Sequence, residues 1–281
     1  MRVVTSVTGM KALAREWKRE GRKVGFVPTM GYLHAGHLSL VRESKQRADV
    51  TVVSVFVNPA QFGPQEDYKK YPRDLDKDSA YLEEAGVDCL FYPGAADIYP
   101  PGYRTYVEVQ GLQERLCGKS RPGHFRGVAT VVLKLFNIVS PDLAFFGAKD
   151  AQQVKIIERM AADLDLAVEV VTCPLVREPD GLALSSRNAY LNTEERRAAL
   201  VLSRSLRWAE RAVAAGERDA ASLVAGIRSA IEAEPLARID YVEAVDPDSL
   251  EPVAEVRGGV LVALAVFIGS TRLIDNIRLR V

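Results

Sequence analysis

Two histidines three residues apart, His34 and His37, lie in the sequence Pro-Thr-Met-Gly-Tyr-Leu-His-Ala-Gly-His at residues 28–37. The apolar run Val24–Val27 precedes this turn, and a helix-like run, His37–Asp49, follows it. A helix N-terminus presents backbone N–H donors and a positive dipole end, and each imidazole adds a donor, so phosphate binds well there. Residues three apart on a helix can face one ligand. The pattern predicts nucleotidyl transfer, in which a nucleophile attacks the α-phosphate of ATP.

Two other interpretations of the pair stay open, namely ordinary surface histidines and a zinc site. The only further histidine, His124, is far away in sequence, and no Cys/His cluster accompanies the pair. The strand–turn–helix context favours nucleotide binding.

Amide side chains follow the second expected strand. Asn58 and Gln61 lie in the sequence Val-Asn-Pro-Ala-Gln-Phe-Gly, directly after an apolar run. Each amide carries donors and an acceptor, which suits the hydroxyl, carbonyl and carboxylate groups of a small ligand. An ordinary Asn-Pro turn is the alternative.

Three further polar segments could bind anions. Lys149 and Asp150 follow an apolar run; the lysine suits phosphates, and the aspartate suits a helix cap or a ribose hydroxyl. The loop Ser185–Arg187 combines two hydroxyls with a guanidinium, which suits an oxyanion. The basic loop Arg121–Gly127 precedes a helix and fits either an acid-binding site or a plain surface.

The elements that would position these residues alternate over the first two thirds of the chain. Expected strands are Lys23–Pro28, Val50–Val57, Val87–Tyr92, Leu143–Phe146 and Ala167–Thr172. Expected helices are Val3–Glu20, His37–Ala48, Leu75–Ala85, Gly127–Val139 and Ala151–Leu164. The alternation predicts an α/β fold, a Rossmann-like parallel sheet with helices on both faces. Ligands of such sheets bind at the carboxyl ends of the strands, near the switch in strand order.

After Val176 the pattern changes to two helices followed by three strands. The helices are expected at Thr193–Gly216, with Thr193 as N-cap, and at Asp219–Glu234. The strands are expected at Arg238–Val245, Val260–Ile268 and Arg272–Leu279, with a hairpin turn at Gly269–Ser270. We therefore predict two domains, residues 1–176 and a smaller C-terminal α+β lid domain, residues 177–281, with an antiparallel sheet.

Composition narrows the class of protein. Within 281 residues, 37 Lys and Arg balance 37 Asp and Glu, so no long-range field attracts nucleic acid or an anionic membrane. The longest apolar run, Gly259–Gly269, is too short to span a bilayer, and the N-terminus lacks an apolar signal core. Three widely spaced cysteines suit reduced thiols. We expect a cytoplasmic protein.

The order and spelling of these segments resemble the pantothenate synthetase (pantoate–β-alanine ligase) family of the His-x-Gly-His nucleotidyltransferases. The resemblance covers nearly the whole chain and is most specific at Pro28–Leu40, Asn58–Phe62, Arg121–Val128, Phe146–Gln153 and Leu184–Asn188. At Ala35, Ala148 and Ala151 the chain has a different residue from the one usual in the family, and none of these three is expected to carry chemistry.

The resemblance implies an AMP-forming carbon–nitrogen ligase of pantothenate and coenzyme A biosynthesis. It would condense pantoate with β-alanine through a pantoyl-adenylate, releasing AMP and pyrophosphate. It further implies Mg²⁺ carried mainly by the ATP phosphates, a homodimer, and small-molecule partners rather than nucleic acid or membrane.

The resemblance also implies roles for individual residues. His34, His37, Lys149 and Arg187 would be catalytic. Gln61 and Gln153 would bind pantoate, and Asn58 would lie near β-alanine. The ATP site would comprise Met30, Gly31, Tyr32, Leu33, His34, Ala35, Gly36, His37, Gly147, Ala148, Lys149, Asp150, Val176, Leu184, Ser185, Ser186 and Arg187.

The implied chemistry has two steps with different needs. A carboxylate with a pKa of about 4 is already ionised, so the attack on ATP needs cations and donors rather than a base. The β-alanine amine, with a pKa of about 10, must lose a proton, which His37 or the departing AMP phosphate would accept. Three alternatives stay open: a phosphopantetheine adenylyltransferase, an aminoacyl-tRNA synthetase, and a catalytically silent nucleotide sensor.

Overall fold

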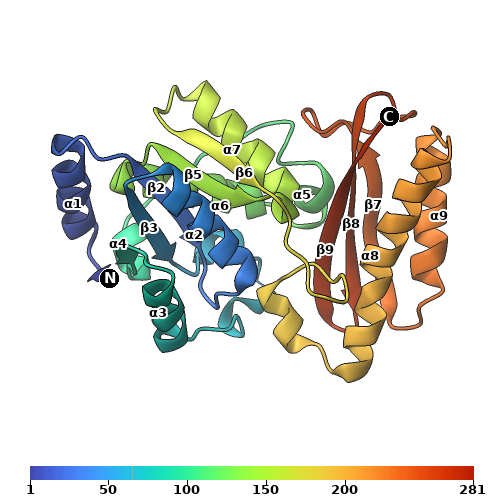
Figure 1. Cartoon of the computed structure of the whole chain (residues 1–281), viewed down its shortest axis with the longest axis horizontal. Helices are drawn as coiled ribbons and strands as arrows, with labels where there is room; N and C mark the ends of the chain where they lie inside the picture. Colours follow the sequence, from blue (N-terminus) through green and yellow to red (C-terminus); the bar gives the residue numbers. More distant parts are fainter. Residues whose placement is uncertain (65) are drawn as a thin grey trace. The chain divides into compact units, whose positions relative to one another are not determined.

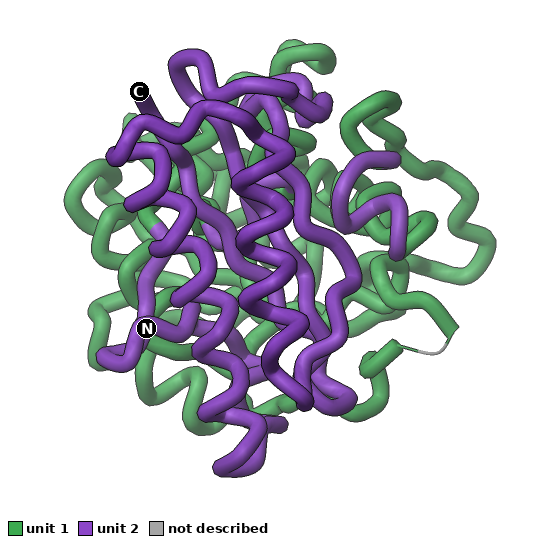
Figure 2. The backbone as a smooth tube through the Cα atoms, turned by 90° about the vertical axis from the view of Figure 1, so that its right-hand side faces the viewer, with its two compact units in different colours: residues 1–113, 121–148, 153–174 green, residues 114–120, 149–152, 175–281 purple. Residues whose placement is uncertain are grey.

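The computed structural model describes residues 1–64 and 66–281, which form two compact units. Unit 1 comprises residues 1–113, 121–148 and 153–174, and unit 2 comprises residues 114–120, 149–152 and 175–281 (Figure 2). Two short segments that precede residue 175 thus belong to unit 2. The domain boundary expected near Val176 stays a prediction.

Unit 1 is built on a six-stranded sheet in which every neighbouring pair is parallel (Figure 1). The strand order is β1-β4-β3-β2-β5-β6. Their bounds are Arg2–Val4 for β1, Val24–Thr29 for β2, Val50–Val55 for β3, Cys89–Phe91 for β4, Leu143–Gly147 for β5 and Glu169–Cys173 for β6. The order reverses between β2 and β5, so the carboxyl ends of these two strands mark the switch point at which ligands of α/β sheets bind.

Helices cover both faces of this sheet because its central strands are apolar on both sides. On one face, Val27 and Phe145 join a buried cluster with Leu40 and Val41 of α2. On the other face, the Phe26 and Phe146 rings pack edge-on against Phe136 of α6. The helices are α1 Val7–Arg19, α2 Ala35–Arg47, α3 Leu75–Glu84, α4 Ala95–Ile98, α6 His124–Val139 and α7 Ala151–Asp163. The predicted α/β class with helices on both faces is confirmed.

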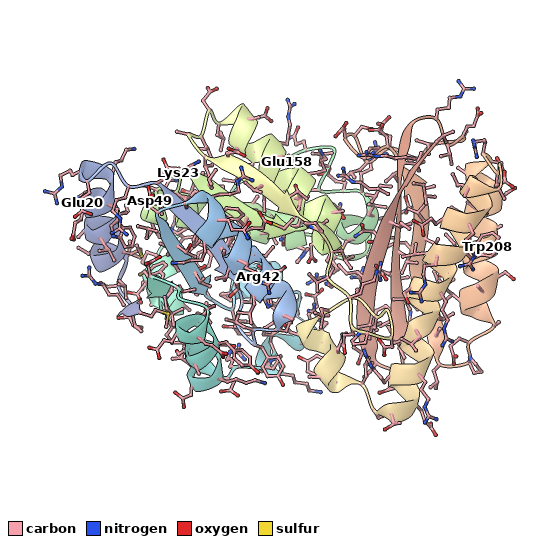
Figure 3. All side chains as sticks on the ribbon, viewed as in Figure 1. Glu20, Lys23, Arg42, Asp49, Glu158 and Trp208 are labelled. Carbon is pink, nitrogen blue, oxygen red and sulfur yellow. The ribbon has the colours of Figure 1, made fainter. Side chains whose placement is uncertain are left out.

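Aspartates hold the amino ends of the central strands in place. The Asp49 carboxylate accepts from the Lys23 N–H at 2.8 Å, just before β2 (Figure 3). The Asp142 carboxylate accepts from the Val24 N–H at 2.7 Å. These contacts fix β2 against β3 and β5, and hence the turn that follows β2.

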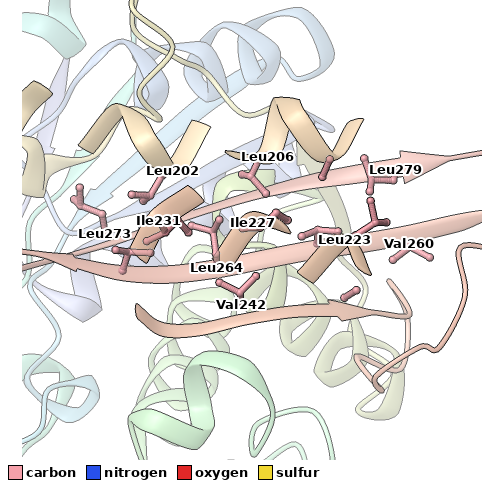
Figure 4. Packing of buried hydrophobic residues seen from close by; sticks show 14 of the residues in the cluster. Leu202, Leu206, Leu223, Ile227, Ile231, Val242, Val260, Leu264, Leu273 and Leu279 are labelled. Atoms are coloured by element: carbon pink, nitrogen blue, oxygen red, sulfur yellow. The ribbon is translucent and has the colours of Figure 1, made fainter. Parts of the chain in front are cut away.

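Unit 2 contains a three-stranded antiparallel sheet and two long helices. The strands β7 Ala237–Val245, β8 Gly259–Ile268 and β9 Thr271–Arg280 follow one another in space. Gly269–Ser270 forms the predicted turn, with Ile268 paired to Thr271. The helices α8 Thr193–Ala214 and α9 Ala220–Glu232 bury their apolar sides on the sheet (Figure 4). The short helix α5, Leu116–Ser120, also belongs to this unit.

Several expected element ends are wrong. Val3 and Val4 lie in β1 because they pair with Leu90 and Phe91 of β4, and α1 starts only after Ser6, whose hydroxyl accepts from the Gly9 N–H at 3.1 Å. The N-cap of α8 is not Thr193 but the residue before it. The Asn192 carboxamide oxygen accepts from the N–H groups of Glu194 and Glu195, each at 2.9 Å.

Two helices begin one turn or less before the expected residue. The helix α2 begins at Ala35 rather than His37, and α6 begins at His124 rather than Gly127. No helix among the described residues is both long and apolar enough to cross a membrane.

Candidate active site

The two histidines form the start of α2, directly beyond the carboxyl end of β2. His34 is the N-cap, and its Nδ1 accepts from the Gly36 N–H at 3.2 Å. The Nδ1 of His37 accepts from the His34 N–H at 3.4 Å, and the two ring centroids lie 4.1 Å apart. The rings thus cap the helix reciprocally, in the manner of a capping box.

This capping fixes the tautomer of both rings. Since each Nδ1 accepts a hydrogen bond, each neutral imidazole carries its proton on Nε2. Each Nε2–H is then a donor next to a helix N-terminus, the arrangement that binds phosphate.

The backbone before the histidines takes an unusual path. Gly31 and Tyr32 both have positive φ, 84° and 51°. A Cβ at Gly31 would lie 2.9 Å from an oxygen of Asp78 and 2.9 Å from a methyl of Val55, so glycine is required there. For Tyr32 the left-handed conformation is strained, and such strain persists only where neighbouring contacts enforce it.

Asp78 supplies those contacts. Its carboxylate accepts from the Tyr32 N–H at 2.8 Å and from the Leu33 N–H at 2.6 Å, and the residue is only 1% exposed. Burial raises the pKa of Asp78, and the N–H groups of Leu33 and Tyr32 oppose that rise. Sequence reasoning missed Asp78 because Asp74 fits as the N-cap of α3, and Asp76 and Asp78 fit equally well as acids of its first turn.

The predicted amide pair is brought together. Asn58 is buried, and its Nδ2 donates to Gln61 Oε1 at 3.0 Å and to the Gly127 carbonyl at 3.1 Å. The hydroxyl of Tyr99 donates to Asn58 Oδ1 at 2.8 Å. Gln61 Nε2 donates to the Met30 sulfur at 3.2 Å, so the amide loop contacts the histidine turn.

Helix α6 holds the amide loop at close range. The 3₁₀ turn Pro59–Gln61 packs on Gly127, where an added Cβ would meet the backbone of Ala60 and Gln61 at 2.2 to 2.7 Å. A glycine is therefore needed at this helical position. No sequence pattern indicated this requirement, because an isolated glycine in a helix pattern is often incidental.

The basic loop at residues 121–127 is tied to an acid. Arg121 Nε and a terminal nitrogen each lie 2.6 Å from a carboxylate oxygen of Glu66. Burial alone would raise the pKa of Glu66, but the hydrogen bonds and charge of Arg121, with smaller effects of the Gly63 N–H and of His124, outweigh it and lower that pKa. Arg121 also donates to His124 Nε2 at 3.2 Å, so Nδ1 of that ring carries the proton and donates to the Gln61 carbonyl at 2.8 Å. The loop therefore supports Gln61.

In unit 2, Lys149 lies in the 3₁₀ turn Ala148–Asp150, and its Nζ is 3.7 Å from an Asp150 oxygen. The side chain of Gln152 is buried and accepts from the Cys117 N–H at 3.0 Å, which ties this segment to α5. Gly147 ends β5 in unit 1, and Gln153 is half-buried in α7.

The Ser-Ser-Arg loop is also capped. Ser185 precedes the 3₁₀ turn Ser186–Tyr190, and its hydroxyl accepts from the Arg187 N–H at 3.3 Å. The Leu184 N–H donates to the Val176 carbonyl at 3.1 Å, so the structure brings these two predicted ATP-site residues together.

The geometry thus gives two sets of predicted residues, one in each unit. Met30–His37, Asn58 and Gln61 gather in unit 1 beyond the β2 and β3 strands. Lys149, Asp150, Val176 and Leu184–Arg187 belong to unit 2. Within residues 1–64 and 66–281, no group of three or more His, Cys, Asp or Glu could hold a metal ion.

Curated relatives match over nearly the full chain. A pantothenate synthetase from Pelotomaculum thermopropionicum is 59% identical over 276 residues, covering 98% of each sequence. One from Acetivibrio thermocellus is 58% identical over 277 residues, covering 99% of each.

Solved structures agree with these relatives. The pantothenate synthetase of Thermus thermophilus is 47% identical, covers 99% of both chains and has a TM-score of 0.94. A pantoate-beta-alanine ligase from Francisella tularensis, complexed with beta-gamma ATP and beta-alanine, is 36% identical with a TM-score of 0.82, covering 99% of this chain and 97% of that one. The model of the pantoate-beta-alanine ligase family matches residues 2–278, and the chain belongs to that family.

Proposed function

We infer that the chain condenses pantoate with β-alanine to pantothenate, at the expense of ATP and through a pantoyl-adenylate. AMP and pyrophosphate are the other products. The observation that carries this inference is membership of the pantoate-beta-alanine ligase family over residues 2–278. The placement of the His34–His37 turn at the switch point of a parallel sheet supports it independently.

In the first step the pantoate carboxylate attacks the α-phosphorus and expels pyrophosphate. Because the nucleophile is already an anion, the protein's task is to place donors and cations on the oxygens that gain charge. We assign this task to the Nε2–H groups of His34 and His37, to Lys149 and to Ser185–Arg187. The remaining ATP-site residues are proposed to hold the nucleotide through backbone groups and contacts; they are Met30, Gly31, Tyr32, Leu33, Ala35, Gly36, Gly147, Ala148, Asp150, Val176 and Leu184.

In the second step the amine of β-alanine attacks the acyl-adenylate carbonyl and must shed a proton. The Nδ1 of His37 already accepts a backbone N–H, and its Nε2 is protonated, so the neutral ring has no ready lone pair for a proton. We therefore assign the proton to the departing AMP phosphate rather than to His37.

Three side-chain amides form the part of the proposed site that binds pantoate and β-alanine. Gln61 and Gln153 are assigned to the hydroxyls and carboxylate of pantoate, and Asn58 to β-alanine. The buried Asn58 amide donates to Gln61 Oε1 at 3.0 Å, which holds the Gln61 side chain in place before a ligand binds. Preorganised donors of this kind cost little at the moment of reaction.

We further propose that Mg²⁺ enters with ATP, held by phosphates and water with at most one or two carboxylates, its usual mode in such sites. It would neutralise the triphosphate charge that the pantoate carboxylate approaches. A homodimer in the cytoplasm, with no nucleic-acid or membrane partner, completes the proposal.

The experiment is pyrophosphate release from Mg·ATP with pantoate, with and without β-alanine. We expect one equivalent of pyrophosphate per active site with pantoate alone, and many turnovers yielding AMP and pantothenate with β-alanine. ATP binding without pyrophosphate release in either mixture would contradict the proposal and favour a silent nucleotide sensor. Release that requires another acceptor in place of pantoate would favour a different nucleotidyltransferase.

A further inference from the structure

Two adjacent residues of β9, Asp275 and Asn276, contact both segments of unit 2 that the proposed function places on ATP. The carboxylate of Asp275 binds the Arg177 guanidinium through two contacts, at 2.7 and 2.9 Å. The side-chain amide of Asn276 donates to the Lys149 carbonyl at 2.9 Å. The backbone N–H of Asn276 also donates to Asp275 Oδ1 at 2.7 Å, which further holds the Asp275 carboxylate.

Arg177 connects Asp275 to the loop that leads to Ser185. Its guanidinium donates to the Gly181 carbonyl at 3.1 Å, and its backbone pairs with Ala183 in an antiparallel bridge. The Leu184 N–H then donates to the Val176 carbonyl at 3.1 Å. The hairpin 176–184 is therefore closed on itself and anchored to β9 by one ion pair.

The position of Asp275 is unusual for a carboxylate. Its side chain is 1% exposed, and the neighbours two and four residues away on the same strand face, Leu273 and Leu279, are buried apolar residues of the unit 2 core. A well-packed apolar pair is often as stable as a buried ion pair or more so, whereas an ion pair fixes one arrangement of its partners. Here the ion pair between Asp275 and Arg177 fixes the geometry of the 176–184 hairpin.

We propose that Asp275 and Asn276 are positioning residues for adenylate formation. Asn276 holds the backbone of Lys149 in position, and Asp275 positions the loop Ser185–Arg187 through Arg177. The Lys149 turn and the loop Ser185–Arg187 are then both held by β9, so their donors keep a fixed position relative to the phosphates. The inference rests on the proposed function, in which Lys149 and Arg187 act on the ATP phosphates.

The first test removes the Asn276 contact without leaving a buried charge. Asn276→Ala should slow single-turnover pyrophosphate release from Mg·ATP and pantoate by about 10- to 100-fold, because a misplacement of about 1 Å has effects of that size. The KM for pantoate should stay within about twofold. Arg278→Ala, two residues along β9 at an exposed position, is the matched control and should leave the rate unchanged.

A double-mutant cycle separates positioning from general damage. If Asn276 acts through Lys149, Asn276→Ala should cause no further loss in the Lys149→Ala background, since residues that act as a unit are not additive. An equal loss in both backgrounds would overturn the proposal. If Lys149→Ala itself left the rate unchanged, the assignment of Lys149 would fail and this inference with it, whereas a slow Lys149→Ala beside a normal Asn276→Ala would refute this inference alone.

The ion pair is tested by exchanging both partners at once. The double variant Arg177→Met with Asp275→Leu leaves no unpaired buried charge, so the protein should fold with a far-UV spectrum like that of the parent. Pyrophosphate release should still fall about 10-fold or more, whereas the same double exchange should cause no further loss in the Arg187→Ala background. A folded double variant with the parental rate would contradict the role of Asp275.

Discussion

At the scale of single residues, His37 performs two tasks with two different atoms. Its Nδ1 caps the backbone of His34, and its Nε2–H is proposed to donate to phosphate. A side-chain amide can replace either atom alone, because the oxygen of Asn overlaps Nδ1 and the NH₂ group of Gln overlaps Nε2. Two amide variants can therefore test the Nε2–H donor while the cap is kept.

We expect His37→Asn to keep the cap and lose the donor, which costs roughly 10²–10³ in the rate of adenylate formation. His37→Gln should retain more of the rate, and since Gln at N3 of a capping box also accepts from the N-cap N–H, its stability should stay within about 0.5 kcal/mol of the parent. Single-turnover pyrophosphate release and urea unfolding measure the two effects. The reverse order of rates would remove the Nε2–H of His37 from the mechanism.

The Asp78 carboxylate is the second residue whose effect is predictable. Asp78→Asn keeps the size but places an NH₂ group against one of the two N–H donors of Tyr32 and Leu33. A buried N–H left without an acceptor costs about 1–3 kcal/mol, so urea unfolding should show a loss of that size. Asp76→Asn, in the same first turn but exposed, should change stability by less than about 0.5 kcal/mol. Equal effects of the two substitutions would show that the turn does not depend on Asp78.

At the scale of elements, the close packing of α6 on the turn Pro59–Gln61 is the contact that places Gln61. A methyl group at Gly127 cannot fit without shifting that turn, although alanine itself favours the helix by about 1 kcal/mol. Gly127→Ala should therefore stabilise the helix locally and at the same time displace the amide loop.

We expect Gly127→Ala to raise the KM for pantoate about 10-fold or more, with a smaller change in the KM for ATP. Steady-state kinetics with each substrate varied would measure this split. Asn137→Ala, at an exposed position of the same helix, tests helix propensity alone and should leave both constants unchanged. An unchanged KM for pantoate in Gly127→Ala would mean that the amide loop does not set pantoate binding.

The elements also show what sequence patterns can predict. The long helices and the apolar strands of the sheet were predicted, since their periodicity is local. The short strand β1 was not, because Arg2–Val4 becomes a strand only by pairing with residues 89–91. Likewise, the Asp78 carboxylate reaches Tyr32 and Leu33 from a distant part of the sequence, and no local pattern encodes such a contact.

At the scale of the whole molecule, each unit has its own buried apolar cluster and its own tryptophan. The cluster of unit 2 surrounds Leu264 of β8, and the cluster of unit 1 surrounds Val27 and Phe145. Trp17 lies in α1 of unit 1, and Trp208 lies on α8 of unit 2 (Figure 3). Single-tryptophan variants can therefore report the unfolding of each unit separately.

We expect Leu264→Ala to cost about 2–5 kcal/mol, because it opens a cavity at a fully buried position of the unit 2 cluster. The loss should fall first on unit 2. In the Trp17→Phe background, thermal unfolding followed by Trp208 fluorescence should shift down by more than in the Trp208→Phe background, where Trp17 reports. Each background without Leu264→Ala is the control. Equal shifts of both probes would show instead that the two cores unfold in one cooperative transition, so that damage to either is shared by the whole chain.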